Sequence, residues 1–184
     1  YYAPEILSKI GLGAKESLLN SIAIGGTNLI FTFVGLYLID KLGRKTLMII
    51  GSLGYIISLG MVAYAFKAAQ GPMFLMSFLL LFIASHAIGQ GAVIWVFLSE
   101  IFPNKIRAMG QSFGASIHWI FAGIITLVTP VFLDEKEGLL KDAPWIIFAF
   151  LAGMMVLQLL WVLTKMPETK GVSLEELERK LVKE

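Results

Sequence analysis

The sequence predicts an all-α protein that crosses a membrane several times. Its main signal is five uncharged runs, at residues 17–39, 46–66, 72–99, 108–133 and 143–164. A helix needs about 20 residues to cross the roughly 30 Å hydrocarbon layer, and each run reaches that length. The composition agrees, because 57% of the residues are hydrophobic, 15% are charged and the mean hydropathy is +0.79. Strands of an outer-membrane barrel alternate over about ten residues, so these uninterrupted runs predict helices.

The segment before the first run predicts a different element. Residues 1–10 open with Tyr-Tyr-Ala-Pro-Glu and contain neither an initiator Met nor a signal peptide. They are too short to span, and Pro4 suits the end of a helix. We expect them to be the end of a truncated transmembrane helix, and the chain to be a fragment of a longer protein.

The rest of the chain divides into a bundle and a tail. Residues 11–164 are expected to form a five-span transmembrane bundle with short connections, including one at Gly71-Pro72. Residues 165–184 are expected to form a tail. Within the tail, Ser173-Leu174-Glu175-Glu176 has the form of a capping box, which predicts a short amphipathic helix covering the ends of the bundle.

The distribution of basic residues predicts the orientation. Five crossings place the loops 40–45 and 100–107 and the tail 165–184 on one side of the membrane. That side holds most of the 15 Lys and Arg, which predicts that it is cytoplasmic. Its basic residues are Lys41, Arg44, Lys45, Lys105, Arg107, Lys165, Lys170, Arg179, Lys180 and Lys183. The net charge of +2 is too small to suggest nucleic-acid binding, and zero cysteines exclude disulfides and thiolate metal sites.

Polar side chains at mid-membrane depth are candidates for a ligand site. Asn28, Gln90, His118 and Trp119 are bulky and polar, so they should face a cavity or a neighbouring helix. Amides and imidazoles both donate and accept hydrogen bonds, and an indole face packs on the C–H surface of a sugar. These residues therefore favour an uncharged, hydroxyl-rich ligand. The small residues in the same spans are also explained by tight helix packing.

Two histidines leave other roles open. His86 and His118 could bind a metal or shuttle protons, but within the spans the only carboxylate is Glu100, at the very end of the third. A metal site is therefore disfavoured, and no cofactor is expected. The spans also hold no nucleophile with its base and no phosphate-binding loop, so we do not expect an enzyme.

Charged and glycine-containing motifs show a family resemblance. The charged ones are Asp40–Lys45, Ser99–Pro103 with Arg107, and Pro167–Gly171. Together with Tyr1–Glu5 and Gly91–Trp95, in this order and spacing, the chain resembles the sugar porter family of the major facilitator superfamily. The resemblance implies the C-terminal six-helix half of a major facilitator fold, with the first helix truncated.

The same resemblance implies a site and a mechanism. The positions that contact sugar in the family fall on Tyr1, Asn28, His86, Gly91, Trp95, His118 and Trp119. Relatives often carry Gln at His118 and an aromatic residue at His86, and they have prolines where this chain reads Ala92 and Ile94. The two halves of such transporters bind substrate between them and rock to give alternating access.

The charged motifs predict a gate on the cytoplasmic side. Its expected members are Asp40, Gly43, Arg44, Glu100, Arg107 and Glu168, with ion pairs joining helix ends that lie at the same depth; topology marking alone is the alternative. The expected function is secondary transport of a monosaccharide, facilitated or proton-coupled, in a bacterial inner membrane. Its expected partners are the sugar, protons, the lipid bilayer and an N-terminal half. A transporter-like sugar sensor is the alternative function.

Overall fold

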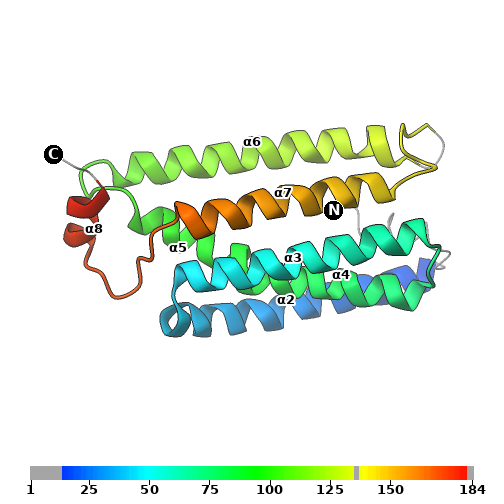
Figure 1. Cartoon of the computed structure of the whole chain (residues 1–184), viewed down its shortest axis with the longest axis horizontal. Helices are drawn as coiled ribbons and strands as arrows, with labels where there is room; N and C mark the ends of the chain where they lie inside the picture. The colour runs from blue at the N-terminus through cyan, green and yellow to red at the C-terminus, as the bar shows by residue number, and fades with distance from the viewer. Residues whose placement is uncertain (1–13, 135–136, 182–184) are drawn as a thin grey trace.

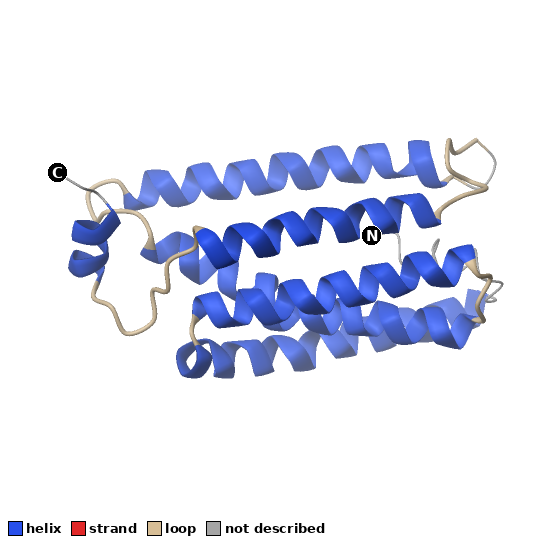
Figure 2. Ribbon diagram, viewed as in Figure 1, coloured by secondary structure: helices blue, strands red, loops and turns tan. Residues whose placement is uncertain are grey.

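Helices make up almost all of the described structure. The computed structural model describes residues 14–134 and 137–181, and within these ranges it contains helices and loops but no strand (Figure 2). The elements are α2 (Ala14–Leu42), α3 (Arg44–Lys67), α4 (Pro72–His86), the π-helix η1 (Ala87–Gly91), α5 (Ala92–Glu100), α6 (Arg107–Leu133), α7 (Trp145–Thr164) and α8 (Leu174–Leu181). The expected helix end at residues 1–10, with Tyr1, lies outside the described residues.

Five helical segments are long and apolar enough to cross a membrane. They are Leu19–Leu42, Arg44–Lys67, Pro72–Glu100, Arg107–Leu133 and Trp145–Thr164. The five spans expected from the sequence are therefore confirmed, with ends that differ by a few residues. The long helices run roughly along one axis, and the loops after α2 and α5 lie at the same end as α8 (Figure 1).

The third span is interrupted in a way that the sequence did not predict. It consists of α4, the π-helix η1 and α5 in direct succession. A π-turn is wider than an α-turn by about one residue, and such turns occur frequently at functional sites. Residues on the two sides of η1 therefore do not keep the facial register of one continuous α-helix.

Helix α3 is the centre of the packed part of the bundle. It contacts α2, α4, η1, α5 and α7. The approach to η1 is close, because a Cβ built on Gly51 would lie 2.9 Å from the Cα of Gly89. Small residues allow such close approach in membranes, where lipid removes the hydrophobic driving force between helices. Gly35 of α2 is a packing position too, since its Cβ would lie 2.9 Å from the carbonyl oxygen of Ala87.

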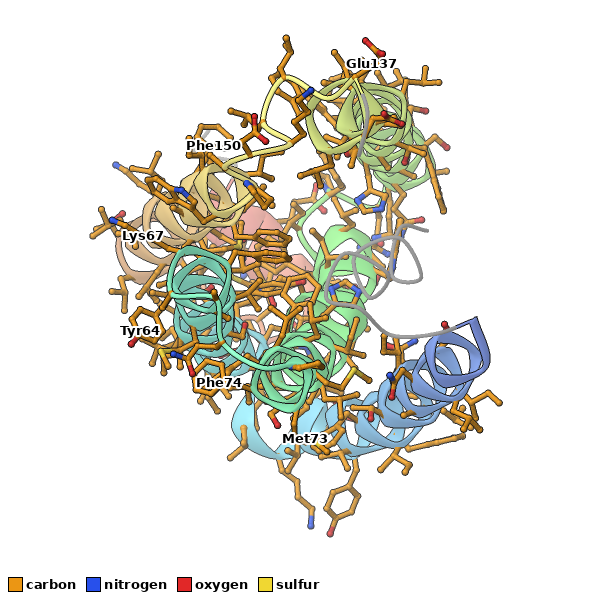
Figure 3. All side chains as sticks on the ribbon, turned by 90° about the vertical axis from the view of Figure 1, so that its right-hand side faces the viewer. Tyr64, Lys67, Met73, Phe74, Glu137 and Phe150 are labelled. Atoms are coloured by element: carbon orange, nitrogen blue, oxygen red, sulfur yellow. The ribbon has the colours of Figure 1, made fainter. Side chains whose placement is uncertain are left out.

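Helix α6 stands apart from this packed part. It contacts the described structure chiefly through α5, and most of its surface is exposed (Figures 1 and 3). The contacts lie near its start, where Gly110 meets the ring of Phe102 and Gly114 meets Leu98. Further along, a Cβ at Gly123 would meet nothing within 4 Å. Most of α6 is thus available to other helices or to a ligand.

The tail contains the short helix α8 (Leu174–Leu181). Helix α8 starts after Ser173, whose hydroxyl accepts a hydrogen bond from the Glu176 backbone N–H at 3.2 Å. This is one half of the capping box. The Glu176 side chain pairs instead with Lys180 at 2.7 Å. Leu177, on the apolar face of the helix, is only 3% exposed.

Candidate functional site

Aromatic and imidazole rings meet where α5 and α6 approach each other. The centroids of Trp95 and His118 are 5.2 Å apart, and those of His118 and Trp119 are 5.4 Å apart. Both pairs are nearly perpendicular, at 73° and 85°, which matches the edge-to-face geometry that ring quadrupoles favour. His118 therefore lies between two indoles, one from each helix.

His86 joins this group from the end of α4. Its ring lies against Gly91, where a Cβ would be 3.2 Å from Nε2. His86 and His118 are close enough to interact electrostatically. The Nδ1 atom of His86 is hydrogen-bonded to the hydroxyl of Tyr55 at 2.5 Å. The structure thus brings together five of the expected sugar-contacting residues, which we call the aromatic cluster: His86, Gly91, Trp95, His118 and Trp119.

The aromatic cluster is open on one side. Trp95 is 43% exposed and Trp119 is 63% exposed, and both histidines are exposed as well. Large aromatic side chains normally bury most of their surface, so exposed indoles next to two imidazoles are available to a partner helix or a ligand. The indoles offer flat apolar faces, and each neutral imidazole offers one donor and one acceptor.

The other expected ligand-lining residues lie elsewhere. Asn28 is exposed on α2, where its backbone carbonyl accepts a hydrogen bond from the Thr32 hydroxyl at 2.7 Å. Gln90 lies in η1 and turns into the bundle, where its amide donates to Ser52 at 3.3 Å. The expectation that Gln90 faces a ligand is therefore wrong. Gln90 and His86 both bond side chains of α3, Ser52 and Tyr55 respectively, but His86 is exposed whereas Gln90 is not.

A charged network ties the chain together at the end that carries α8. Arg44 donates from Nη2 to Glu100 Oε1 at 2.8 Å and from Nε to Glu100 Oε2 at 3.2 Å. It also donates to Asp40 at 3.1 Å and to the carbonyl of Ile39 at 3.1 Å. The Arg44 and Glu100 side chains are only 11% and 18% exposed, so this forked pair is largely desolvated.

Glu168 connects the tail to the start of α3. Its carboxylate accepts hydrogen bonds from the backbone N–H groups of Arg44 at 2.9 Å and Lys45 at 3.0 Å. It also accepts from those of Thr169 and Lys170, at 3.0 and 2.9 Å. Burial by itself raises the pKa of Glu168, but the four N–H donors outweigh it and the net effect lowers the pKa. A carboxylate at a helix N-terminus is also favoured by the helix dipole.

Gly43 is required for this arrangement in two ways. Its φ of +91° lies in the region that favours glycine. In addition, a Cβ at this position would lie 2.5 Å from Glu168 Oε2. Gly43 has no side chain to cap α3, and the glutamate from the tail supplies that function in its place.

Arg107 and Thr169 differ from expectation. Arg107 was expected to pair with acids, but its Nε donates to the backbone carbonyl of Phe102 at 3.2 Å. Thr169 was not singled out, yet it is 3% exposed and donates to Glu100 Oε2 at 2.6 Å. Its position between Glu168 and Lys170 in the tail motif was the available signal. We call Asp40, Arg44, Glu100, Glu168 and Thr169 the charged network.

Metal binding finds no support in this geometry. In the described ranges, no group of three or more His, Cys, Asp or Glu side chains converges as metal ligands would. The two histidines lie among aromatic rings, and the acids Glu100 and Glu168 are bonded to Arg44, Thr169 and backbone N–H groups. The arrangement suits recognition of a neutral polar molecule in one place and mechanical coupling of helix ends in the other.

Comparison with known proteins finds sugar transporters. The chain is 37% identical over 180 residues to the D-xylose-proton symporter of Escherichia coli (strain K12), covering 97% of this chain and 36% of the relative. It is 35% identical to the glucose transporter GlcP of Staphylococcus epidermidis, covering 98% of this chain and 40% of that protein. The chain thus spans less than half the length of these relatives, which are transporters and not enzymes.

Solved structures agree with the sequence comparison. The proton:xylose symporter XylE bound to 6-bromo-6-deoxy-D-glucose matches with a TM-score of 0.89 and 34% identity, covering 99% of this chain and 38% of that chain. An inward open conformation of XylE from E. coli matches with a TM-score of 0.78 and 30% identity, over 97% and 40% of the two chains. The family model "Sugar (and other) transporter" matches residues 1–181. The chain therefore belongs to the sugar porter family of the major facilitator superfamily.

Proposed function

We propose that this chain is part of a secondary transporter that carries a monosaccharide across a membrane by alternating access. The observation that carries the proposal is the exposed aromatic cluster on α4, α5 and α6. Indole faces can pack on the C–H surface of a sugar ring while the imidazoles bond its hydroxyls. Relatives named as xylose, glucose and arabinose transporters support a monosaccharide as the substrate class.

The sugar site would combine the aromatic cluster with residues from other elements. We assign His86, Gly91, Trp95, His118 and Trp119 to this site, together with Asn28 from α2 and Tyr1. Transporters of this type bind substrate between two halves. Because the relatives are more than twice as long as this chain, the opposite wall of the site would come from further spans.

The charged network would act as the gate on one side. Arg44, Glu100 and Glu168 connect the α2–α3 loop, the end of α5 and the tail, so helix ends that must separate during opening are bonded together. We assign Asp40, Gly43, Arg44, Glu100 and Glu168 to the gate, with Arg107 as a supporting member through the backbone of Phe102.

The orientation follows from the basic residues and the position of the gate. We place the loops 40–45 and 100–107 and the tail 165–184 in the cytoplasm of a bacterial cell, with the bundle in the inner membrane. Residues 11–164 would form the bundle. Protons would be coupled substrates if the protein resembles its symporter relatives in this respect.

Counterflow of labelled sugar tests the proposal. The full-length protein in proteoliposomes preloaded with D-xylose or D-glucose should accumulate the same labelled sugar. Trp95→Ala and Asn28→Ala should each weaken binding, and a loss of one good contact corresponds to about fivefold or more in affinity. Binding without counterflow would point to a sensor instead. If both variants bound sugar as the wild type does, the site assignment would be wrong.

A further inference from the structure

Tyr55 is a buried polar residue outside the aromatic cluster, and it contacts the cluster through His86. It lies on α3, is 8% exposed, and packs its ring against Phe82 with centroids 4.9 Å apart. Its hydroxyl lies 2.5 Å from Nδ1 of His86. Packing would be satisfied by a phenylalanine at this position, so the hydroxyl and its bond to the histidine require a separate explanation.

The chemistry of the two groups indicates where the shared proton lies. A neutral imidazole has one nitrogen that donates and one that accepts. A phenol is a better hydrogen-bond donor than an imidazole N–H, and an imidazole nitrogen is a better acceptor than a phenol oxygen. The favoured arrangement therefore has the Tyr55 hydroxyl donating to Nδ1. It follows that Nε2 of His86 carries the hydrogen.

The surroundings of Nε2 leave that hydrogen available. Gly91 lies beside the ring edge at Nε2, and a Cβ built on this glycine would lie 3.2 Å from Nε2. The missing side chain therefore leaves this edge of the ring uncovered. His86 is exposed, and it lies near His118 at the centre of the aromatic cluster. Because His86 is exposed and Gly91 places no side chain beside Nε2, an N–H group at this position is accessible to a ligand.

We infer that Tyr55 is a positioning residue, whose hydroxyl holds His86 as the Nε2–H tautomer so that the site presents a hydrogen-bond donor to an oxygen of the sugar. The inference rests on the proposed function, since it assumes that the aromatic cluster holds a monosaccharide. Without the tyrosine hydroxyl the imidazole populates both tautomers, and part of the population presents an acceptor instead. Tyr55 thereby influences specificity without touching the substrate, because a fixed donor favours hydroxyl oxygens over groups that only donate, such as an ammonium.

Nitrogen NMR on the full-length protein with ¹⁵N-labelled histidine tests the tautomer directly. This chain contains two histidines, His86 and His118. In a His118→Gln variant, the histidine signals that remain from this segment are those of His86. The wild-type protein should show a protonated Nε2 and an unprotonated Nδ1 at His86, and Tyr55→Phe should give a mixture. A wild-type His86 protonated at Nδ1, or a Tyr55→Phe protein with the same tautomer as wild type, would overturn the inference. The wild-type spectrum decides the tautomer even if the variant fails to fold.

Sugar binding provides the second measurement. Tyr55→Phe should raise the Kd for D-xylose or D-glucose about three- to tenfold, the range expected for one weakened hydrogen bond, and leave the maximal counterflow rate near the wild-type value. Tyr64→Phe is the matched control, because it makes the same change on the same helix. Tyr64 lies near the C-terminal end of α3, is 53% exposed and packs with Phe74. Its side chain points away from the bundle (Figure 3).

The two measurements separate failure of this inference from failure of the proposed function. If neither sugar binds the wild-type protein, the proposed function fails, while the His86 tautomer still shows whether Tyr55 fixes it. If sugar binds and Tyr55→Phe has the same affinity as Tyr64→Phe, Tyr55 has no positioning role and the transport proposal is unaffected.

Discussion

At the scale of single residues, Glu168 joins the tail to the start of α3. One carboxylate accepts four backbone N–H groups, two from the start of α3 and two from the tail. Glu168→Gln keeps the shape but removes the charge, and an amide has only one accepting oxygen. We expect the free energy of unfolding to fall by only about 1 kcal/mol, because the carboxylate is partly exposed and solvent screens its charge. Melting temperature in detergent measures the loss. Glu176→Gln, on the exposed surface of α8, should melt as the wild type does.

The lowered pKa of Glu168 predicts how this contribution depends on pH. A carboxylate with a lowered pKa in the folded state stabilises the fold above its unfolded pKa of about 4.3, and the contribution disappears as the pH falls through the folded value. The difference in melting temperature between wild type and Glu168→Gln should therefore stay constant from about pH 5 to 8 and shrink below about pH 4. A difference that changed between pH 6 and 8 would assign the effect to another group.

At the residue level, the sequence indicated contacts where charge itself was the signal, and the Arg44–Glu100 pair is one of them, while the gate role stays a prediction. Arg44, Glu100 and Glu168 were identified because charges at the ends of apolar runs must meet partners or solvent. Thr169 was missed, since a hydroxyl in a loop is common and only folding buries it against Glu100. The partner of Arg107 was predicted wrongly, because a shared depth does not determine the direction of a side chain.

At the scale of elements, the π-helix η1 is held by a shared hydroxyl. Ser52 on α3 is fully buried and accepts from Gln90 of η1 at 3.3 Å and from Gln158 of α7 at 3.4 Å. Ser52→Ala removes the acceptor of both amides, and we expect a loss of about 1–3 kcal/mol, the cost of leaving buried polar groups unsatisfied. Ser77→Ala on α4 is the control, since that exposed hydroxyl bonds only the carbonyl of Met73 in its own helix. Equal melting temperatures of the two variants would contradict a clamping role for Ser52.

The spans and the π-turn show which features of an element a sequence encodes. The spans were predicted to within a few residues, because lipid cannot hydrogen-bond to backbone groups. An uncharged run long enough to cross the membrane therefore has to form a helix. The π-turn was not predicted, since it depends on the contact of Gly89 with Gly51 and on the bonds of Gln90, which are tertiary. The bond of Gln90 to Ser52 of α3 is likewise a tertiary contact, which the spacing of polar residues along one helix does not encode.

At the scale of the whole molecule, the charged network and the aromatic cluster share one helix, α5, which carries Glu100 of the network and Trp95 of the cluster. The span that ends at Glu100 also carries His86 and Trp95, and α6 carries His118 and Trp119. A rigid span that moves at one end changes position at the other, so release of the network and reshaping of the sugar site would be coupled. This coupling predicts that a mutation in the network changes the balance of states and leaves the contacts of the sugar unchanged.

Glu100→Ala tests that coupling. It removes the forked partner of Arg44 and the acceptor of Thr169, both of which bind helix ends together. Because the pair is largely desolvated, we expect the equilibrium to shift toward opening at this end by about 1–3 kcal/mol, or about 5- to 150-fold. Cysteine labelling from each side of oriented vesicles measures the shift, and binding to the open state should keep the wild-type Kd. Glu175→Ala, an exposed acid of α8 at the same end, should leave labelling unchanged. A Glu100→Ala protein with wild-type labelling on both sides would show that these charges mark topology and do not gate.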